Sequence, residues 1–319
     1  MKTSTSKRLR WNVAIWLAAG LFMTSTAGMA SGPIMPDPKA EARHQPQVEE
    51  TANGIPLVNI TAPSSGGVSR NEYEIFNVPD KGAILNNSYT LSKTELAGYV
   101  QGNNNMAERP AKIIVNEVTG AGSTSMDGFL EVAGNRADVV IANPNGITVN
   151  GGGFINTGKA FLTTGKPVYD GEDHLQRFDI TGGDILIEGK GLGGKETGSL
   201  AILSRAVKIN AGIWAKDLHI TTGANSIDAK TLEASAIEGK GGHPAFALDT
   251  AAIGGMYAGR ITLVGTEKGL GVNNSGIWSA EDNLTLDWNG DLKNSGTIYS
   301  KGNTDLRASR LENDKTIAA

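Results

Sequence analysis

Cysteine is absent from this sequence of 319 residues, and aromatic residues make up only 6% of it. The absence of cysteine excludes a disulfide scaffold and every metal site or nucleophile that is built on a thiol. Only four histidines occur, which leaves little material for a histidine-rich metal centre. An excess of basic charge is also lacking, because 29 Lys and Arg stand against 33 Asp and Glu. The resulting net charge of −4 gives no general electrostatic signature of nucleic-acid binding. We therefore expect no metal, no cofactor and no nucleic-acid partner.

Glycine, in contrast, is abundant: the sequence contains 42 glycines, well above the usual share of about 7%. The apolar share of 39% is ordinary for a folded chain, which excludes wholesale disorder. The sequence is also long enough to bury a sizeable core.

The first 30 residues have the organisation of a secretory signal peptide. A basic segment precedes an apolar stretch from Trp11 to Met23, which is shorter than the roughly 20 residues needed to span a bilayer. Small residues favour cleavage between Ala30 and Ser31, after export through the Sec translocase. Residues 31–50 carry four prolines among charged residues, so we expect an extended leader there.

From residue 51 onward, short apolar runs alternate with Gly, Asn, Asp and Pro. Runs such as Ile113–Val115, Ala137–Ile141 and Ile185–Ile187 have the length and pattern of strands. The best candidate for a helix is Ser92–Val100, where Ser92 and Glu95 could form a capping box. Helical patterns of ten residues between the strands are missing, which argues against an α/β enzyme and predicts an all-β fold.

Several of these patterns recur at a nearly constant spacing. The recurrences, each with its offset, are Ile185/Ile187 with Val207/Ile209 (22), Leu284/Leu286 with Leu306/Ala308 (22), Leu263 with Leu286 (23), Asn274–Gly276 with Asn294–Gly296 (20), Leu292–Asn294 with Leu311–Asn313 (19), and Asn210–Trp214 with Asn274–Trp278 (64, close to three periods). A strand-rich repeat of this length is the signature of a solenoid, in which each coil must stack on its neighbours to bury its apolar side.

A parallel β-helix with coils of about 20–23 residues fits this repeat best. Aliphatic side chains would stack inside, Asn side chains could form ladders between coils, and Gly would permit the corners. Leucine-rich repeats share the period, but the several leucines that they need in each repeat are missing; an antiparallel sandwich remains the alternative. The sequence stops inside a repeat at Thr316–Ala319, so we expect a longer protein from which this chain is cut short.

Phrases along the chain resemble the N-terminal secretion domain of two-partner-secreted exoproteins, the family of filamentous haemagglutinins, haemolysins and contact-dependent-inhibition toxins. The phrases are Asn53–Ile60, Ile84–Asn87, Ile114–Thr119, Ala142–Thr148, Gly153–Thr157, Leu162–Pro167 and Gly254–Ile261. The resemblance implies a right-handed parallel β-helix with short extra-helical strands. It also implies a secretion, or haemagglutination activity, domain over residues 51–260 and the start of filamentous-haemagglutinin-type repeats over residues 261–319.

The same resemblance implies a partner and a destination. An outer-membrane transporter of the two-partner-secretion barrel type would recognise this secretion signal, in folded or semi-folded form, in the periplasm. It would thread the chain outward, and the chain would fold into the β-helix outside, at the cell surface or secreted. A receptor on a target cell is a further possible partner. Adhesin, haemolysin and growth-inhibition toxin all remain open as the activity of the whole protein.

The segment Asn143–Ile147 is the candidate recognition motif that the resemblance points to. Its composition suits a type I β-turn, so it could shape a corner between strands as readily as contact the transporter. The family's other Asn-Pro phrase aligns with Asn103–Met106, which lacks the proline and is therefore degenerate. The candidate transporter-recognition residues are Asn143, Pro144, Asn145, Gly146, Ile147, Asn103, Asn105 and Met106.

Motifs that would carry catalysis fail on inspection, and we predict no catalytic residue and no enzyme activity. Gly189–Gly194 matches a dinucleotide-binding pattern but is not followed by a helical sequence. The acidic residues beside His174 suggest a solvated loop. Trp214, Trp278 and Trp288 recur with the repeats, which favours packing over a sugar platform. The alternative function, a polysaccharide lyase or hydrolase on a β-helix, would need paired carboxylates on adjacent coils.

Overall fold

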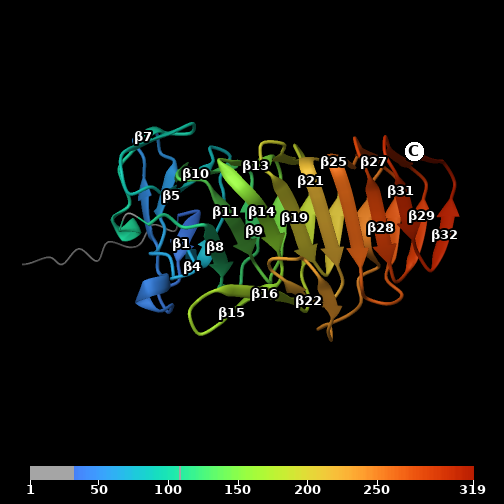
Figure 1. The fold of residues 1–319 in the computed structure, drawn as a ribbon, viewed down its shortest axis with the longest axis horizontal. Coiled ribbons are helices and arrows are strands. Elements are labelled where there is room, and N and C mark those ends of the chain that lie inside the picture. The colour runs from blue at the N-terminus through green and yellow to red at the C-terminus, as the bar shows by residue number, and fades with distance from the viewer. Residues whose placement is uncertain (1–31, 108) are drawn as a thin grey trace, which may run out of the picture. The chain divides into compact units, whose positions relative to one another are not determined.

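The computed structural model describes residues 32–107 and 109–319, and these contain strands β1 to β33 and two short 3-10 helices. Most strands stack in three long rows, so that residues 32–319 form a β-helix whose coils follow one another along its axis (Figure 1). The predicted all-β class and the predicted parallel β-helix are therefore confirmed. The predicted signal peptide, with its cleavage site between Ala30 and Ser31, lies outside the described residues.

Strands of successive coils pair in parallel on three faces, and β21 and β25 each serve two faces. The first face contains β3 (Pro56–Asn59), β5 (Ala83–Asn87), β10 (Phe129–Gly134), β13 (Gly152–Ile155), β18 (Leu192–Gly194), the first halves of β21 (Gly212–Thr222) and β25 (Gly255–Gly265), β27 (Ile277–Ala280), β30 (Thr297–Ser300) and β33 (Thr316–Ala318). The second face contains β4 (Val68–Phe76), β8 (Ile113–Val118), β11 (Ala137–Ala142), β14 (Thr157–Thr163), β19 (Ser199–Ser204), the second halves of β21 and β25, β28 (Leu284–Trp288) and β31 (Thr304–Arg307). The third face contains β9 (Thr124–Met126), β12 (Ile147–Val149), β17 (Asp184–Ile187), β20 (Ala206–Ile209), β24 (Phe246–Thr250), β26 (Gly271–Asn274), β29 (Asp291–Asn294) and β32 (Arg310–Asn313).

The core is a column of aliphatic side chains that point inward from all three faces. Leu263, Leu286 and Ile298 are each 0% exposed, and Leu263 pairs with Leu286 on the next coil. Adjacent strands lie about 4.8 Å apart, so each inner side chain touches its equivalents on both neighbouring coils. Burying one such side chain contributes about 1.5–3 kcal/mol. The prediction that Leu286 lies inside the stack is confirmed.

Uninterrupted coils have the predicted length. Ile185 pairs with Val207 at an offset of 22, and Asn274 pairs with Asn294 at an offset of 20. The Asn side chains also form the expected ladder: the Nδ2 of Asn274 donates to Asn294 at 2.8 Å, and that of Asn294 donates to Asn313 at 2.7 Å. Each side-chain amide thus donates to the asparagine one coil further on.

Two predicted alignments are wrong in detail. Leu286 pairs with Leu306, and Leu284 pairs with Thr304, so this coil has 20 residues and the alignment with Leu306/Ala308 is shifted by two. A shift of two keeps every side chain on its predicted side of a strand, so the alternating pattern could not reveal it.

The second wrong alignment concerns the tryptophans. Ile213 pairs with Met256, which pairs with Trp278, so the equivalent of Trp278 is Ile213 and not Trp214. The offset of 64 therefore covers two coils, one of which is long. Trp278 is fully buried and Trp288 is 3% exposed, which confirms packing for both. Trp214 lies instead on the outer side of β21, because a slip of one residue reverses the side.

Residues 34–50, which we expected as an extended leader, instead form part of the fold. They comprise β1 (Ile34–Pro36), the 3-10 helix η1 (Ala42–His44) and β2 (Gln47–Glu50). β1 pairs antiparallel with β4, and β2 pairs antiparallel with β3. The side chain of His44 is buried, and its Nδ1 lies 3.0 Å from a carboxylate oxygen of Glu72. These tertiary contacts order a segment whose prolines and charges indicated no element.

The helix that we expected at Ser92–Val100 is wrong. The segment is a hairpin of β6 (Ser92–Thr94) and β7 (Gly98–Val100), which projects from the first face (Figure 1). Its turn is held by Glu131, whose carboxylate accepts the N–H groups of Glu95 and Leu96 at 2.7 and 2.9 Å. In a helix capped by Ser92, the amide of Glu95 would have donated to the Ser92 side chain, whereas here it donates to a carboxylate on the distant strand β10.

A small antiparallel sheet covers the second face. In Figure 1 it lies at the bottom of the view, whereas the β6–β7 hairpin lies at the top. The sheet consists of β15 (Lys166–Tyr169), β16 (Leu175–Ile180), β22 (Asn225–Asp228) and β23 (Ala234–Ala236). Phe178 and Ile227 from this sheet are fully buried against outward-pointing residues of the helix such as Val140. The expected extra-helical strands are thus present, and they bury apolar side chains that the helix leaves outside.

Candidate functional site

The turn from Asn143 to Gly146 connects β11 on the second face with β12 on the third. The N–H of Gly146 donates to the carbonyl of Asn143 at 3.1 Å, and the Asn143 Oδ1 accepts the N–H of Asn145 at 2.9 Å. These bonds close the β-turn that the sequence indicates. Gly146 has a φ of +110°, which strongly favours glycine over residues with a side chain.

The turn is anchored at one end and exposed at its tip. The side chain of Asn143 is fully buried, and its Nδ2 donates to the Gly122 carbonyl and to the Thr124 Oγ1, both at 3.0 Å. Pro144 and Asn145 are exposed. The side chain of Asn143 therefore fixes the position of the backbone from which the next two residues project.

The segment Asn103–Met106, which contains the 3-10 helix η2 (Asn104–Met106), repeats this geometry. The Asn103 Oδ1 accepts the N–H of Asn105 at 3.0 Å, and the N–H of Met106 donates to the Asn103 carbonyl at 3.1 Å. The Asn103 side chain is 3% exposed, and its Nδ2 donates to the carbonyls of Ile60 and Asn86 at 2.8 and 2.9 Å. Loss of the proline therefore leaves the turn closed by the same bonds.

The third residue of each turn is also placed in the same way. The Nδ2 of Asn145 donates to the Gly120 carbonyl at 2.8 Å, and that of Asn105 donates to the Ile60 carbonyl at 3.0 Å. The fourth positions differ, because a buried Met106 stands where the other turn has Gly146. Asn103–Met106 is thus degenerate in its sequence, as we expected, but its turn is closed by the same hydrogen bonds as the Asn143 turn.

The structure does not bring the two turns together. The Asn103 turn is hydrogen-bonded to Asn86 of β5 and to Ile60, which directly follows β3, and both strands belong to the first face. The Asn143 turn lies between the second and third faces. No hydrogen bond among the described residues joins them. Ile147, the last residue of the candidate motif, is 1% exposed and points into the core at the start of β12. It is therefore not available to a partner in the folded chain.

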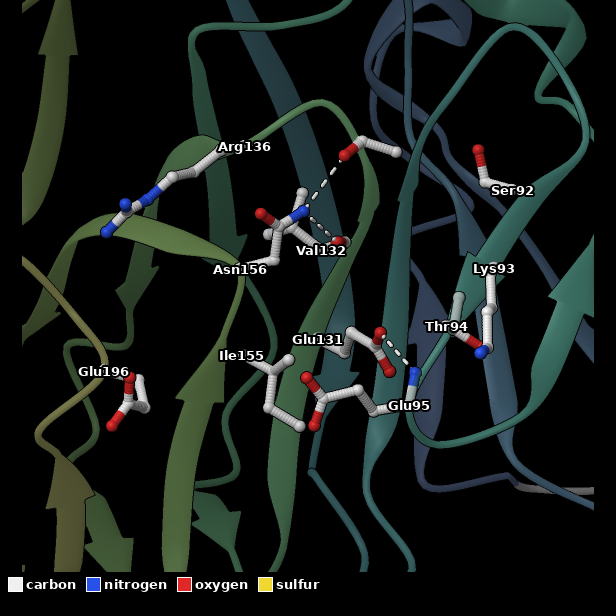
Figure 2. A pocket seen from close by; sticks show the side chains of 11 residues that line it. Ser92, Lys93, Thr94, Glu95, Glu131, Val132, Arg136, Ile155, Asn156 and Glu196 are labelled. Atoms are coloured by element: carbon white, nitrogen blue, oxygen red, sulfur yellow. Dashed lines mark hydrogen bonds between the residues drawn. The ribbon is translucent and has the colours of Figure 1, made fainter.

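A cleft of about 1000 Å³ lies between the β6–β7 hairpin and the coils of the first face, and we call it the hairpin cleft (Figure 2). Glu131, Glu95 and Glu196 line it, together with Lys93 and Arg136. Burial raises the pKa of Glu131, although the two amides that it accepts oppose this. The Glu131 carboxylate is occupied in holding the hairpin, so it does not form the free carboxylate pair of a glycosidase.

The other motifs of the sequence have structural explanations. In Gly189–Gly194, a turn at Gly189 and Lys190 is followed by β18 and not by a helix. Asp170 and His174 form an exposed pair at 2.9 Å, as a solvated loop would, but Asp173 is bonded to Arg43 of the N-terminal segment. Among residues 32–107 and 109–319, no cluster of three His, Asp or Glu could hold a metal ion. No helix in that part is long and apolar enough to cross a membrane.

Comparison with known proteins decides the family. The model of the TPS secretion domain matches residues 33–298, which is most of the chain. The chain belongs to the TPS secretion domain family. A crystal structure of the filamentous hemagglutinin secretion domain superposes with a TM-score of 0.74 at 31% identity, over 90% of this chain and 99% of that one. The family match begins within the segment that the sequence indicates as an extended leader.

Curated relatives of this TPS domain are much longer proteins. The chain is 43% identical over 299 residues to a "Toxin CdiA" of Yersinia pestis and 44% identical over 280 residues to a "16S rRNA endonuclease CdiA" of Enterobacter cloacae. Each alignment covers 86% of this chain. The chain spans only 9% and 8% of the length of these two relatives. The domain thus corresponds to a small part of each.

Sequence reasoning missed two features of this TPS domain. One is a buried polar cluster in which Arg70 lies 2.9 Å from Glu72 and 3.4 Å from Glu117, and its guanidinium lies 4.3 Å from the ring centre of Tyr169. Burial raises the pKa of Glu117. No local signal could have revealed this cluster, because Arg70 and Glu72 of β4 meet Glu117 of the next coil and Tyr169 of the small antiparallel sheet. The other feature is a row of outward aromatic rings that only the register reveals.

Proposed function

We propose that this domain targets a longer polypeptide for export by two-partner secretion. The Sec translocase would deliver the chain to the periplasm after recognising residues 1–30. An outer-membrane transporter of the barrel type would then bind the domain and pass the polypeptide to the cell surface or the medium. The match of the TPS secretion domain model to residues 33–298 is the observation that carries this proposal.

We assign transporter recognition to the exposed tips of the two Asn turns. Pro144 and Asn145 project from a backbone that the buried Asn143 holds in place, and Asn103 places the exposed Asn104 and the half-buried Asn105 equivalently. A preorganised turn loses little conformational entropy when a partner binds it. We expect the buried Asn143 and Asn103 to act through the position of the turns and not through contact.

For the whole protein we propose an adhesin or a growth-inhibition toxin that acts at the surface of a target cell through a receptor there. The names of the relatives, a toxin and an endonuclease, support the second activity, and the likeness to the filamentous hemagglutinin secretion domain supports the first. We propose no catalytic role for the domain itself.

Secretion assays with single Asn substitutions test the role of the turns. Asn145→Asp removes the donor to the Gly120 carbonyl, a bond worth about 0.5–1.5 kcal/mol at most, and adds a charge at the exposed tip. We expect secretion with the cognate transporter to fall at least fivefold while the melting temperature of the purified chain changes by only a few degrees. Asn105→Asp should behave alike, because its turn has the same bonds.

The matched control is Asn303→Asp, which makes the same chemical change at an exposed position far along the helix. It should leave both secretion and stability unchanged. Normal secretion of both Asn145→Asp and Asn105→Asp would remove these side chains from recognition. Lost secretion with a much lower melting temperature would show that they act on folding alone.

A further inference from the structure

Outward-pointing residues of the first face align in a row along the helix axis. In stacking order the row is Phe129, Gly153, Gly193, Trp214, Tyr257, Ser279 and Tyr299. Phe129 is 43% exposed, and Trp214 and Tyr257 are half-buried. The chain has few aromatic residues, yet the structure places three of them within four coil steps on one outer surface.

Glycines hold these rings close to the backbone. A Cβ at Gly153 would come within 2.4 Å of the Phe129 ring, and a Cβ at Gly212 would come within 2.5 Å of the Trp214 ring. Trp214 and Tyr257 are stacked with a centroid distance of 6.1 Å and an interplanar angle of 16°. The rings are therefore fixed in orientation before any ligand arrives, which reduces the entropy cost of binding.

The rings border a groove that we call the aromatic groove. A hollow of about 340 Å³ lies between Phe129 and Trp214 over Gly193, and a second hollow of about 450 Å³ lies beside Tyr257. Lys195 lines both hollows. Glu196 lines the first hollow and also the hairpin cleft, where Figure 2 shows it opposite the hairpin. Because they share these lining residues, the three hollows lie next to one another along the first face.

The rim of the aromatic groove is charged but balanced. The ammonium groups of Lys195 and Lys216 accompany the carboxylates of Glu196 and Glu281 around the two hollows. A surface with no net charge gives no advantage to an anionic or a cationic ligand. Its charged groups can instead donate hydrogen bonds to, and accept them from, neutral hydroxyl groups.

We propose that the aromatic groove binds a neutral oligosaccharide. The C–H faces of pyranose rings would lie against Phe129 and Trp214, and their hydroxyl groups would bond to the charged rim. An extended peptide fits less well, because strand addition needs an unpaired strand edge, and the strands of this face are paired on both sides from β5 to β30. The four coil steps from Phe129 to Tyr257 span about 19 Å, the length of three or four linked sugar rings.

Calorimetric titration of the purified chain with cellohexaose, chitohexaose and maltohexaose tests the proposal. At least one of these probes should bind with a Kd below about 1 mM, within the range of weak specific association. Trp214→Ala and Phe129→Ala should each weaken that binding at least tenfold, and Trp214→Phe should retain most of it. Tyr299→Ala, on the same row but outside the aromatic groove, should leave it unchanged.

Thermal unfolding of each variant shows whether it is folded. If Trp214→Ala does not fold, the loss of binding expected for Phe129→Ala still tests the proposal. Absence of binding by all three sugars would overturn the proposal, as would binding that is indifferent to both ring substitutions. Binding of an unfolded polypeptide, such as reduced and carboxymethylated α-lactalbumin, that requires Trp214 while no sugar binds would make the groove a polypeptide site instead. The secretion assays do not depend on this result, so the two proposals can fail separately.

Discussion

His219 should make the folded chain sensitive to mild acid. It lies on the outer side of β21 between Ala201 and Thr262 of the neighbouring coils, and its Nε2 is 2.8 Å from the Thr221 Oγ1. Burial lowers the pKa of His219 from 6.5 to about 4. The folded chain therefore holds this imidazole neutral at a pH where the unfolded chain already binds a proton.

The size of the effect follows from the two pKa values. They differ by about 2.5, and a difference of one corresponds to about 1.4 kcal/mol. Because the pKa of His219 is lower in the folded chain, protonation favours the unfolded chain. The contribution of the neutral His219 to the free energy of unfolding is complete above about pH 7, declines as the pH falls below 6.5 and is lost by about pH 4. The free energy of unfolding should thus fall by roughly 2–3 kcal/mol between pH 7 and pH 4.5 through His219 alone.

Urea unfolding of the parent chain and of His219→Gln at several pH values measures this contribution. Other groups titrate over the same range, so the informative quantity is the free energy of unfolding of the parent minus that of His219→Gln. This difference should fall by roughly 2–3 kcal/mol on acidification from pH 7 to pH 4.5. His243→Gln is the matched control, because that side chain is 73% exposed and its pairing with Glu267 contributes little. Parallel pH profiles of the parent and His219→Gln would refute the reasoning.

Three further changes test the core, the ladder and a buried ion pair by chemical denaturation. Leu286→Ala should lower the free energy of unfolding by about 2–5 kcal/mol, while Asp287→Ala at the next, exposed position should change it by less than about 0.5 kcal/mol. Asn294→Ala, in the middle of the Asn ladder, should cost about 1–3 kcal/mol because it leaves buried groups unpaired, and a smaller loss than that of the exposed Asn313→Ala would contradict this account. The guanidinium of Arg205 donates to both carboxylate oxygens of Glu267 at 3.0 and 2.8 Å. Arg205→Met should cost about 1–3 kcal/mol because the carboxylate loses both bonds and keeps only the Ala224 amide and the exposed His243, and a neutral result would show that the pair adds no stability.

The fold could be predicted because each coil repeats the same physical requirement. A parallel β-helix needs aliphatic residues at every second position and the same pattern one coil later. Ile185/Ile187 and Val207/Ile209 display that pattern directly. An alignment error that keeps the alternation intact, such as the shift of two residues at Leu306, could not be detected from the sequence pattern. The number of coils was also mispredicted where β22 and β23 lengthen one coil. An insertion of this kind does not change the alternating pattern of the strands before or after it.

Local patterns failed where distant residues determine the conformation. Ser92–Val100 carries the signals of a capped helix, but Glu131 binds the two turn amides from another coil. His44 lies in a segment rich in proline and charge, yet Glu72 and the β4 strand bury it. In both cases the deciding partner is more than 25 residues away in the sequence, so no window of neighbouring residues contained the information.

The candidate site shows the converse relation between sequence and structure. Two turns that differ in sequence, one with proline and one without, are closed by the same Asx bond and the same backbone bond. Proline only favours the backbone angle at its own position, whereas the buried amides of Asn143 and Asn103 attach each turn to its neighbouring coils. The asparagine at the first position therefore carries the structural requirement, and the residue after it is free to vary. A sequence motif defined by its proline would miss the Asn103 turn, and one defined by the spacing of its two asparagines finds both turns.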